Sequence, residues 1–170
     1  MRGKTKLSVH SDLQCPSAQP DMAGAVAFGL IDHSADSPTT AFLEATVPVT
    51  PELLEMAAPL PPAQVFRFSA PCQKQRCSHW EGACTLADRI VNLLPTASLA
   101  LPPCRIRTSC RWFAEQGRAA CQRCPQVVTE TARPDELMVR AAQPPVPPGK
   151  KDGESASTAS EAPIVDASCG

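Results

Sequence analysis

Aromatic residues are scarce in this sequence, and tyrosine is absent. Phenylalanine and tryptophan together make up only 4% of the chain, although large rings usually contribute much of the buried area of a core. A chain with so little to bury needs further stabilisation, which small domains commonly obtain from metals or disulfides. Its 170 residues therefore suit one modest domain with tails rather than two independent domains.

Long hydrophobic runs are also missing. No segment reaches the roughly 18 apolar residues that a membrane-spanning helix requires. The best candidate, residues 23–31, lies between Asp21 and Asp32, and no cleavage site of the signal-peptide form follows it closely. We therefore expect a cytoplasmic protein with no membrane partner. In that reducing compartment, clustered cysteines more often serve metal or redox chemistry than structural disulfides, and the nine cysteines cannot all pair.

The motifs of common enzyme chemistries are missing as well. The sequence contains no GxSxG, no phosphate-binding glycine loop, no HExxH and no dinucleotide fingerprint. We therefore do not expect the chain to be an enzyme on its own. A catalytic metal cluster with one iron left open to substrate is a weaker alternative, because nothing in the sequence marks a substrate pocket.

Composition divides the chain into four segments. Residues 1–21 are polar and predict a flexible N-terminal arm, which carries Cys15. Residues 22–71 predict a short β-rich segment that packs on a cysteine-rich metal-binding region, residues 72–140. Residues 141–170 are rich in proline, serine and alanine and cannot bury enough apolar area to offset their ordering entropy, which predicts a disordered tail. Cysteines on the two termini, Cys15 and Cys169, are expected to be dispensable.

Periodicity and turn residues predict the secondary structure. Strands are expected over 25–31, 42–49, 65–69 and 127–131, the first two joined through a turn at 32–38. Helices are expected from Thr50 to before Pro59, over 85–94, and from Ser109 towards Gly117. The predicted fold class is α+β: a small, cysteine-rich, metal-organised domain with a few short strands and two or three short helices, between disordered termini.

The cysteine-rich region contains two linear groups of metal-ligand candidates. They are Cys72-x4-Cys77-x-His79-x4-Cys84 and Cys104-x5-Cys110-x10-Cys121-x2-Cys124. Thiolates are the preferred ligands of iron–sulfur clusters and of structural zinc alike. Each group offers four donors, so two four-coordinate sites are possible, as is one site that draws on both groups. We rank the second group first, and His79 is either the fourth ligand of the first group or an ordinary surface or supporting residue.

The spacing favours an iron–sulfur cluster, 4Fe–4S rather than 2Fe–2S, over Zn²⁺. Structural zinc sites usually build on two short-spaced cysteine pairs, and this region has one such pair. Its wider spacings suit a bulkier cluster, and Cys124 precedes a proline as the last ligand of bacterial cluster-binding sequences does. A redox-active dithiol at Cys121 and Cys124 is a further alternative, although five more cysteines crowd the sequence before it.

Charge is spread unevenly along the chain. Residues 72–124 hold eight Lys/Arg against three Asp/Glu, whereas the segments before and after each hold four against seven. Five arginines interleave with the second cysteine group: Arg105, Arg107, Arg111, Arg118 and Arg123. A positive field attracts acidic partners and favours the reduced form of a cluster. We therefore expect a small iron–sulfur protein in electron transport, or an accessory to a partner enzyme, that docks an acidic redox partner.

The principal alternative belongs to a different functional class. It is a zinc-organised binding module that uses the arginine-rich surface for nucleic acid or for an acidic protein partner. Nucleic acid is the less favoured partner, because the whole chain carries a net charge of −1 and lysine is scarce in residues 72–124. The sequence carries no signal for an oligomeric state.

Overall fold

Residues 13–146 are described by the computed structural model, and they form one four-stranded antiparallel sheet with several short helices. The strands are β1 (Gln14–Ala18), β2 (Val26–Asp32), β3 (Thr39–Pro48) and β4 (Phe66–Pro71), and their order in the sheet is β1-β4-β2-β3. The α-helices are α1 (Pro51–Glu55), α2 (Pro62–Val65), α3 (Thr85–Leu93), α4 (Arg111–Arg123) and α5 (Glu136–Ala142). Three 3₁₀ turns are η1 (Lys74–Arg76), η2 (Arg107–Ser109) and η3 (Cys124–Gln126). The α+β class predicted from the sequence is confirmed.

The β2–β3 hairpin matches the prediction for residues 25–49. Its strands pair antiparallel, and the Asp32 side chain accepts a hydrogen bond of 2.8 Å from the Ser34 backbone at the turn. Gly29 packs tightly against β3, since a Cβ there would lie 2.5 Å from the Thr40 methyl carbon. The hairpin therefore follows from alternating apolar residues on either side of polar turn residues.

The two faces of the sheet bury different side chains. Phe66 and Phe68 of β4 face the small helices α1 and α2, where they pack with Ala57 and with partly buried Leu53 and Val65. The intervening Arg67 points to the opposite face, as alternation along a strand requires. Helix α1 begins as predicted, with the Thr50 hydroxyl accepting from the Leu53 backbone and proline at the first helical position.

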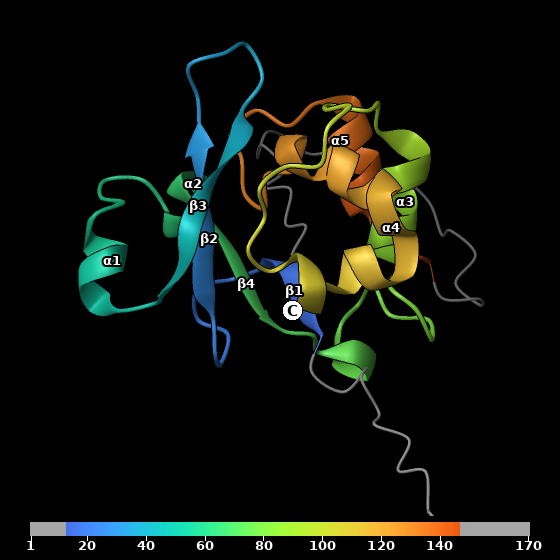
Figure 1. The fold of residues 1–170 in the computed structure, drawn as a ribbon, viewed down its shortest axis with the longest axis horizontal. Coiled ribbons are helices and arrows are strands. Elements are labelled where there is room, and N and C mark those ends of the chain that lie inside the picture. Colours follow the sequence, from blue (N-terminus) through green and yellow to red (C-terminus); the bar gives the residue numbers. More distant parts are fainter. Residues whose placement is uncertain (1–12, 147–170) are drawn as a thin grey trace, which may run out of the picture.

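Helices α3, α4 and α5 form a second layer beside the sheet (Figure 1). Leu86 and Ile90 of α3 pack with Trp112 of α4 and Met138 of α5 in one apolar cluster. Helix α3 confirms the helix expected over 85–94. Helix α5 was not predicted; it begins at Asp135, whose carboxylate accepts from the Met138 backbone at 2.8 Å.

Two segments differ from expectation. Within the segment expected to be a flexible arm, β1 pairs with β4 and buries Cys15 to 1% exposure, because its side chains are small enough to pack against that strand. The strand expected over 127–131 does not form, although Val127 and Val128 are buried. The Val127 carbonyl instead accepts a hydrogen bond from Arg67, and the Thr129 hydroxyl contacts the Ser17 hydroxyl at 3.4 Å. This segment is therefore buried without pairing to a neighbouring strand.

The rest of the predicted arm and tail, residues 1–12 and 147–170 with Cys169, lies outside the described residues. Among residues 13–146, no helix is both long enough and apolar enough to cross a bilayer.

Candidate metal centre

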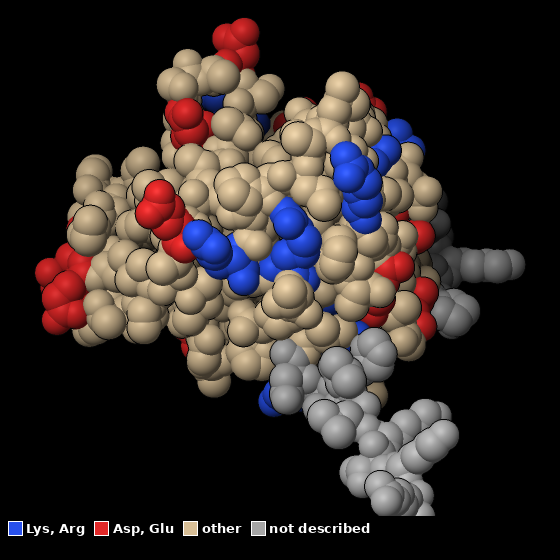
Figure 2. All heavy atoms as spheres, viewed as in Figure 1, with Lys and Arg blue, Asp and Glu red and all other residues tan. Residues whose placement is uncertain are grey.

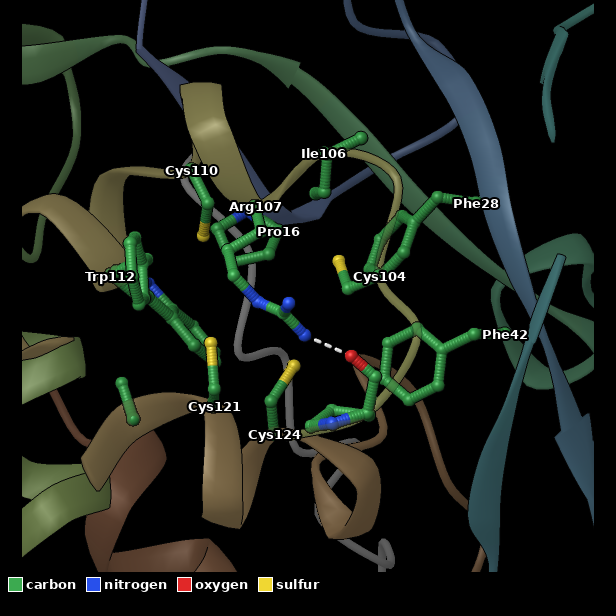
Figure 3. Close-up of a pocket in the computed structure, with 13 residues that line it drawn as sticks. Pro16, Phe28, Phe42, Cys104, Ile106, Arg107, Cys110, Trp112, Cys121 and Cys124 are labelled. Carbon is green, nitrogen blue, oxygen red and sulfur yellow. Dashed lines mark hydrogen bonds between the residues drawn. The ribbon is translucent and has the colours of Figure 1, made fainter. Parts of the chain in front are cut away.

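One cavity brings together the four cysteines that the sequence ranks first. Cys104, Cys110, Cys121 and Cys124 line it together with apolar side chains that include Phe28, Phe42 and Trp112 (Figure 3). All four cysteines are free thiols. They come from separate places, a loop before η2, the residue preceding α4, the second half of α4 and the start of η3. Four thiols that are spread over 21 residues of the sequence therefore line one cavity.

Gly117 makes this arrangement possible. An unbroken helix would separate Cys110 from Cys121 by about 16 Å, too far for ligands of one centre. Gly117 has φ 59° and ψ −142°, which interrupts α4 and redirects residues 118–123. The sequence predicted Gly117 as the end of a helix; the helix does end there, and a second helical stretch follows immediately. The redirected stretch carries Cys121 back to the cavity.

Arg67 links the backbone around Cys124 to the sheet. Its buried guanidinium donates to the backbone oxygens of Pro16 at 2.8 Å and Cys124 at 3.1 Å, and also to that of Val127. It also lies 3.8 Å from the Cys124 thiol and 5.3 Å above the Phe28 ring. In the part of the chain that the structure describes, Arg67 forms no ion pair with a carboxylate. It therefore places an uncompensated positive charge beside a candidate ligand.

Arg107 extends between the four thiols (Figure 3). Its guanidinium donates to the Pro102 carbonyl oxygen and to the Cys121 thiol. The space left around it is about 10 Å³, roughly what one water molecule needs. The Arg107 Nε–H and the Trp112 indole N–H are both buried without a hydrogen-bond partner. Two residues of this cavity thus carry buried donors that lack an acceptor, which is uncommon in folded proteins.

Burial favours the neutral form of three thiols of this cavity, those of Cys104, Cys110 and Cys121. Burial raises the pKa of Cys104 to about 11, and it also raises the pKa of Cys110. Burial raises the pKa of Cys121 too, against the opposing effect of the hydrogen bond from Arg107. Metal binding requires thiolates, so a metal that enters this cavity has to displace protons.

The first cysteine group differs in part from the prediction, because Cys15 lies beside it and His79 has a different partner. Cys77 is buried together with Cys15, half-buried Cys72 packs against them, and Cys84 adjoins them through its bridge to Trp80. His79 is buried at 1% exposure, and its Nδ1 lies 2.8 Å from the Arg89 guanidinium. Because arginine is only a donor, Nδ1 accepts this hydrogen bond. Over residues 13–146, no three His, Cys, Asp or Glu side chains are arranged to hold a metal ion directly.

The basic residues of the 72–124 segment are partly surface groups and partly structural. Arg105 and Arg118 are exposed, whereas Arg111 is buried and pairs with Glu115 at 3.3 Å. Figure 2 shows basic groups over the middle of one face, across the region of η2 and α4, and acidic groups towards the ends of the molecule at α1 and the β2–β3 hairpin. Acidic groups also lie at the right-hand edge of this view, beside α3 and α4, so the charge separation along the sequence is kept only over the middle of this face.

Comparison with family models, curated proteins and solved structures found no significant match to this chain. Sequence reasoning missed Arg67 and Cys15. Arg67 could have been noticed because it is a charged residue in the middle of a predicted strand, between Phe66 and Phe68. The strand that contains Cys15 could have been noticed from the small residues around Cys15.

Proposed function

We propose that this chain binds an iron–sulfur cluster of the 4Fe–4S type through Cys104, Cys110, Cys121 and Cys124, and that it serves electron transfer or acts as an accessory to a partner enzyme. The observation that carries the proposal is the convergence of these four thiols on one cavity. Four cysteine thiolates are the usual ligand set of such a cluster.

The arrangement of the thiols favours a cluster over a single zinc ion. In a tetrahedral zinc site with Zn–S bonds of about 2.3 Å, the sulfur atoms lie roughly 3.8 Å apart. No described side chains converge in that manner, and the thiols instead surround the Arg107 side chain. In a four-iron cluster each thiolate binds a different iron, so the sulfur atoms stand further apart. Thiols that surround a side chain suit a bulky group better than a single ion, and Arg107 has to move aside for it, because the free space beside it is only about 10 Å³.

The polar groups around the cavity also suit an anionic cluster. A four-thiolate cluster is negatively charged overall, and its sulfur atoms accept hydrogen bonds that tune its reduction potential. The unsatisfied N–H groups of Arg107 and Trp112 supply donors at the cavity. The buried Arg67 charge, which has no carboxylate partner among residues 13–146, gains a counter-charge. The rings of Phe28, Phe42 and Trp112 exclude water from the remaining walls.

The surface offers a route for electrons and a place for a partner. Cys104 is half-buried, whereas the other three ligands are buried, so it lies nearest to solvent. The neighbouring Arg105 is exposed, as is Arg118 on α4. An acidic redox protein fits this surface, because complementary charge steers association. Nucleic acid binding by a zinc form is the competing outcome, and it would show a steep dependence on salt.

The first test is the metal and acid-labile sulfide content of the full-length chain purified without oxygen, together with its visible spectrum. Iron with matching sulfide and a brown colour is the expected result. Cys121→Ser and Cys124→Ser should each remove at least half of the iron and sulfide, whereas Cys169→Ser should remove none. Zinc without colour would overturn the cluster proposal, and full iron content in both variants would remove these cysteines from the ligand set.

A further inference from the structure

The remaining four described cysteines lie together on the other side of β1. Cys15 and Cys77 form one buried cluster, against which Cys72 and Trp80 pack. Cys84 is buried at the edge of the helix cluster and is joined by a β-bridge to Trp80, which places it beside this group. Cys15 lies far from the other three cysteines in the sequence, so the four do not form a linear motif that would predict the group.

Strand pairing sets this group in place. β1 pairs with β4 so that Cys15 stands opposite Ala70, two residues before Cys72. The Cys72 backbone N–H donates to the Leu13 carbonyl at 2.9 Å and continues the pairing beyond the strands. The turn η1 then leads to Cys77, and a bridge between Trp80 and Cys84 closes the following loop. Two segments that are fixed by backbone hydrogen bonds thus bring four cysteines to one part of the fold, although among residues 13–146 no three such side chains already surround a common point.

The surroundings repeat the features of the first cavity. Arg111 lies 5.2 Å above the Trp80 ring, and its Nε and one terminal nitrogen are buried without a hydrogen-bond partner. Glu115 pairs with Arg111 and also accepts from the Cys84 backbone at 2.8 Å. The His79 backbone N–H points to the Cys77 thiol at 3.4 Å. Each group of four thiols therefore has a tryptophan ring and an arginine with unsatisfied, buried N–H groups.

His79 supports the structure around this group through hydrogen bonds and does not act as a ligand. Its ring Nδ1 accepts from Arg89, which in turn donates to the Ala141 carbonyl at 2.8 Å. The His79 carbonyl accepts from the backbone and the hydroxyl of Thr85. These bonds join the loop before α3 to α5, so a structural role accounts for the burial of this histidine.

The two groups are separated by single residues. Neighbouring side chains on a strand point to opposite sides, and along β1 Pro16 lines the first cavity while Cys15 belongs to the second group. At the start of α4, Trp112 lines the first cavity while Arg111 stacks on Trp80. A parallel bridge joins Gln14 to Cys110 between them. The two thiol groups are thus neighbours across β1.

We propose that Cys15, Cys72, Cys77 and Cys84 hold a second four-thiolate metal centre, an iron–sulfur cluster like the first, and that Cys15 rather than His79 is its fourth ligand. This centre goes beyond the single cluster proposed above. It depends on its own four thiols, and its presence does not require the first centre to be loaded.

The test reconstitutes the full-length chain with Fe²⁺ and sulfide in the absence of oxygen and measures iron, zinc and sulfide per chain. Cys15→Ser and Cys121→Ser should each lower the metal content about twofold, and the double variant should lower it at least tenfold. His79→Asn and Cys169→Ser should retain the wild-type content. Full metal content in Cys15→Ser would overturn the proposal, as would a twofold loss in His79→Asn alone. Full content in Cys121→Ser with a twofold loss in Cys15→Ser would remove the first centre and leave the second.

Cys15 is buried, so its substitution can disturb folding. Cys72→Ser is the second variant, because Cys72 is only half-buried and belongs to the same group. A twofold loss of metal in Cys72→Ser, with unchanged circular dichroism and an unchanged signal from the first centre, supports the proposal even where Cys15→Ser fails to fold. Unchanged metal content in Cys72→Ser rejects it.

Discussion

The Arg67 guanidinium and Cys124 meet twice, through the Cys124 backbone oxygen at 3.1 Å and through its thiol at 3.8 Å. The same guanidinium donates to the Pro16 carbonyl at 2.8 Å. One side chain of the sheet therefore fixes both a proposed ligand and the strand that separates the two thiol groups. These bonds compensate for burying a strongly charged residue in a strand whose neighbouring positions hold phenylalanine.

Replacement of Arg67 by lysine should destabilise the protein by about 3 kcal/mol, because a single ammonium group cannot reach carbonyls that lie in several directions. Urea unfolding of the metal-free chain measures this change. Arg105→Lys is the matched control, since Arg105 is exposed, and it should stay within roughly 0.5 kcal/mol of the wild type. Equal stability of the two variants would show that the bonds of Arg67 are not needed for the fold.

Gly117→Ala should lower both stability and the metal content of the first centre. The new methyl group meets no atom within 4 Å, so the cost comes from the backbone, whose φ and ψ values are those of glycine, and it should be about 1–3 kcal/mol. Relief of that strain straightens α4 and moves Cys121 away from Cys110. The measurement is iron per chain after anaerobic reconstitution.

Ala114→Gly is the control for this change. It lies in the first half of α4 at an exposed position and should cost about 1 kcal/mol through helix propensity alone. It leaves the kink unchanged, so its metal content should equal that of the wild type. Loss of metal to the same degree in both variants would indicate general destabilisation rather than misplaced ligands.

The metal-free protein should lose stability as the pH rises above 9. The pKa of Cys84 is raised from 9.0 to about 12 by burial, so the unfolded chain loses this proton before the folded chain does. Stability contributed by the neutral thiol is complete below pH 9 and declines as the pH rises towards 12. Between pH 9 and pH 10 the decline should be on the order of 1 kcal/mol for this thiol, as measured by urea unfolding.

The metal-loaded protein should show the opposite dependence. Its cysteines are already deprotonated, so acid competes with the metal and binding weakens as the pH falls. Cluster absorbance followed from pH 8 to pH 5 measures this effect.

For the metal-free chain, a free energy of unfolding that rises with pH above pH 9 would contradict the neutral form of the buried thiols.

Charge reversal at Arg105 and Arg118 should slow electron exchange with anionic oxidants. Both side chains are exposed, and their positive field concentrates anions near Cys104. The double variant to glutamate should be oxidised several-fold more slowly by ferricyanide and faster by a cationic cobalt(III) ammine, with both differences shrinking at high salt. Arg133→Glu with Arg140→Glu adds the same charge outside this segment and should change neither rate by as much. Identical rates for all variants would exclude steering by this surface.

The elements that the sequence predicted are those encoded locally. The β2–β3 hairpin, the start of α1 at Thr50 and helix α3 each depend on turn residues, caps and periodicity within a short window. The four cysteines of the first cavity also form a recognisable group in the sequence. The kink at Gly117 was only half predicted, because a glycine that ends one helix does not show that another begins directly after it.

The elements that escaped prediction depend on distant partners. β1 contains a proline and only five residues, and it is a strand because β4 pairs with it from more than fifty residues away. Residues 127–131 include four β-branched side chains, yet the Val127 carbonyl is taken by Arg67 and the Thr129 hydroxyl contacts Ser17, and no strand forms. The place of Cys15 in a group of thiols follows from the same pairing. Local pattern carries no information about any of these contacts.

The position of β1 at the edge of the sheet gives the second centre a consequence for the lifetime of the protein. β4 lies directly inside β1, and its apolar residues include Phe66, Phe68 and Ala70. If oxygen destroys the cluster that fastens Cys15, the edge strand loses its anchor and β4 presents unpaired backbone groups, a template for aggregation. Air-exposed protein should then precipitate as it bleaches. Protein that has lost its cluster to oxygen would thus aggregate, and it would not remain in solution to compete with the intact protein for the partner.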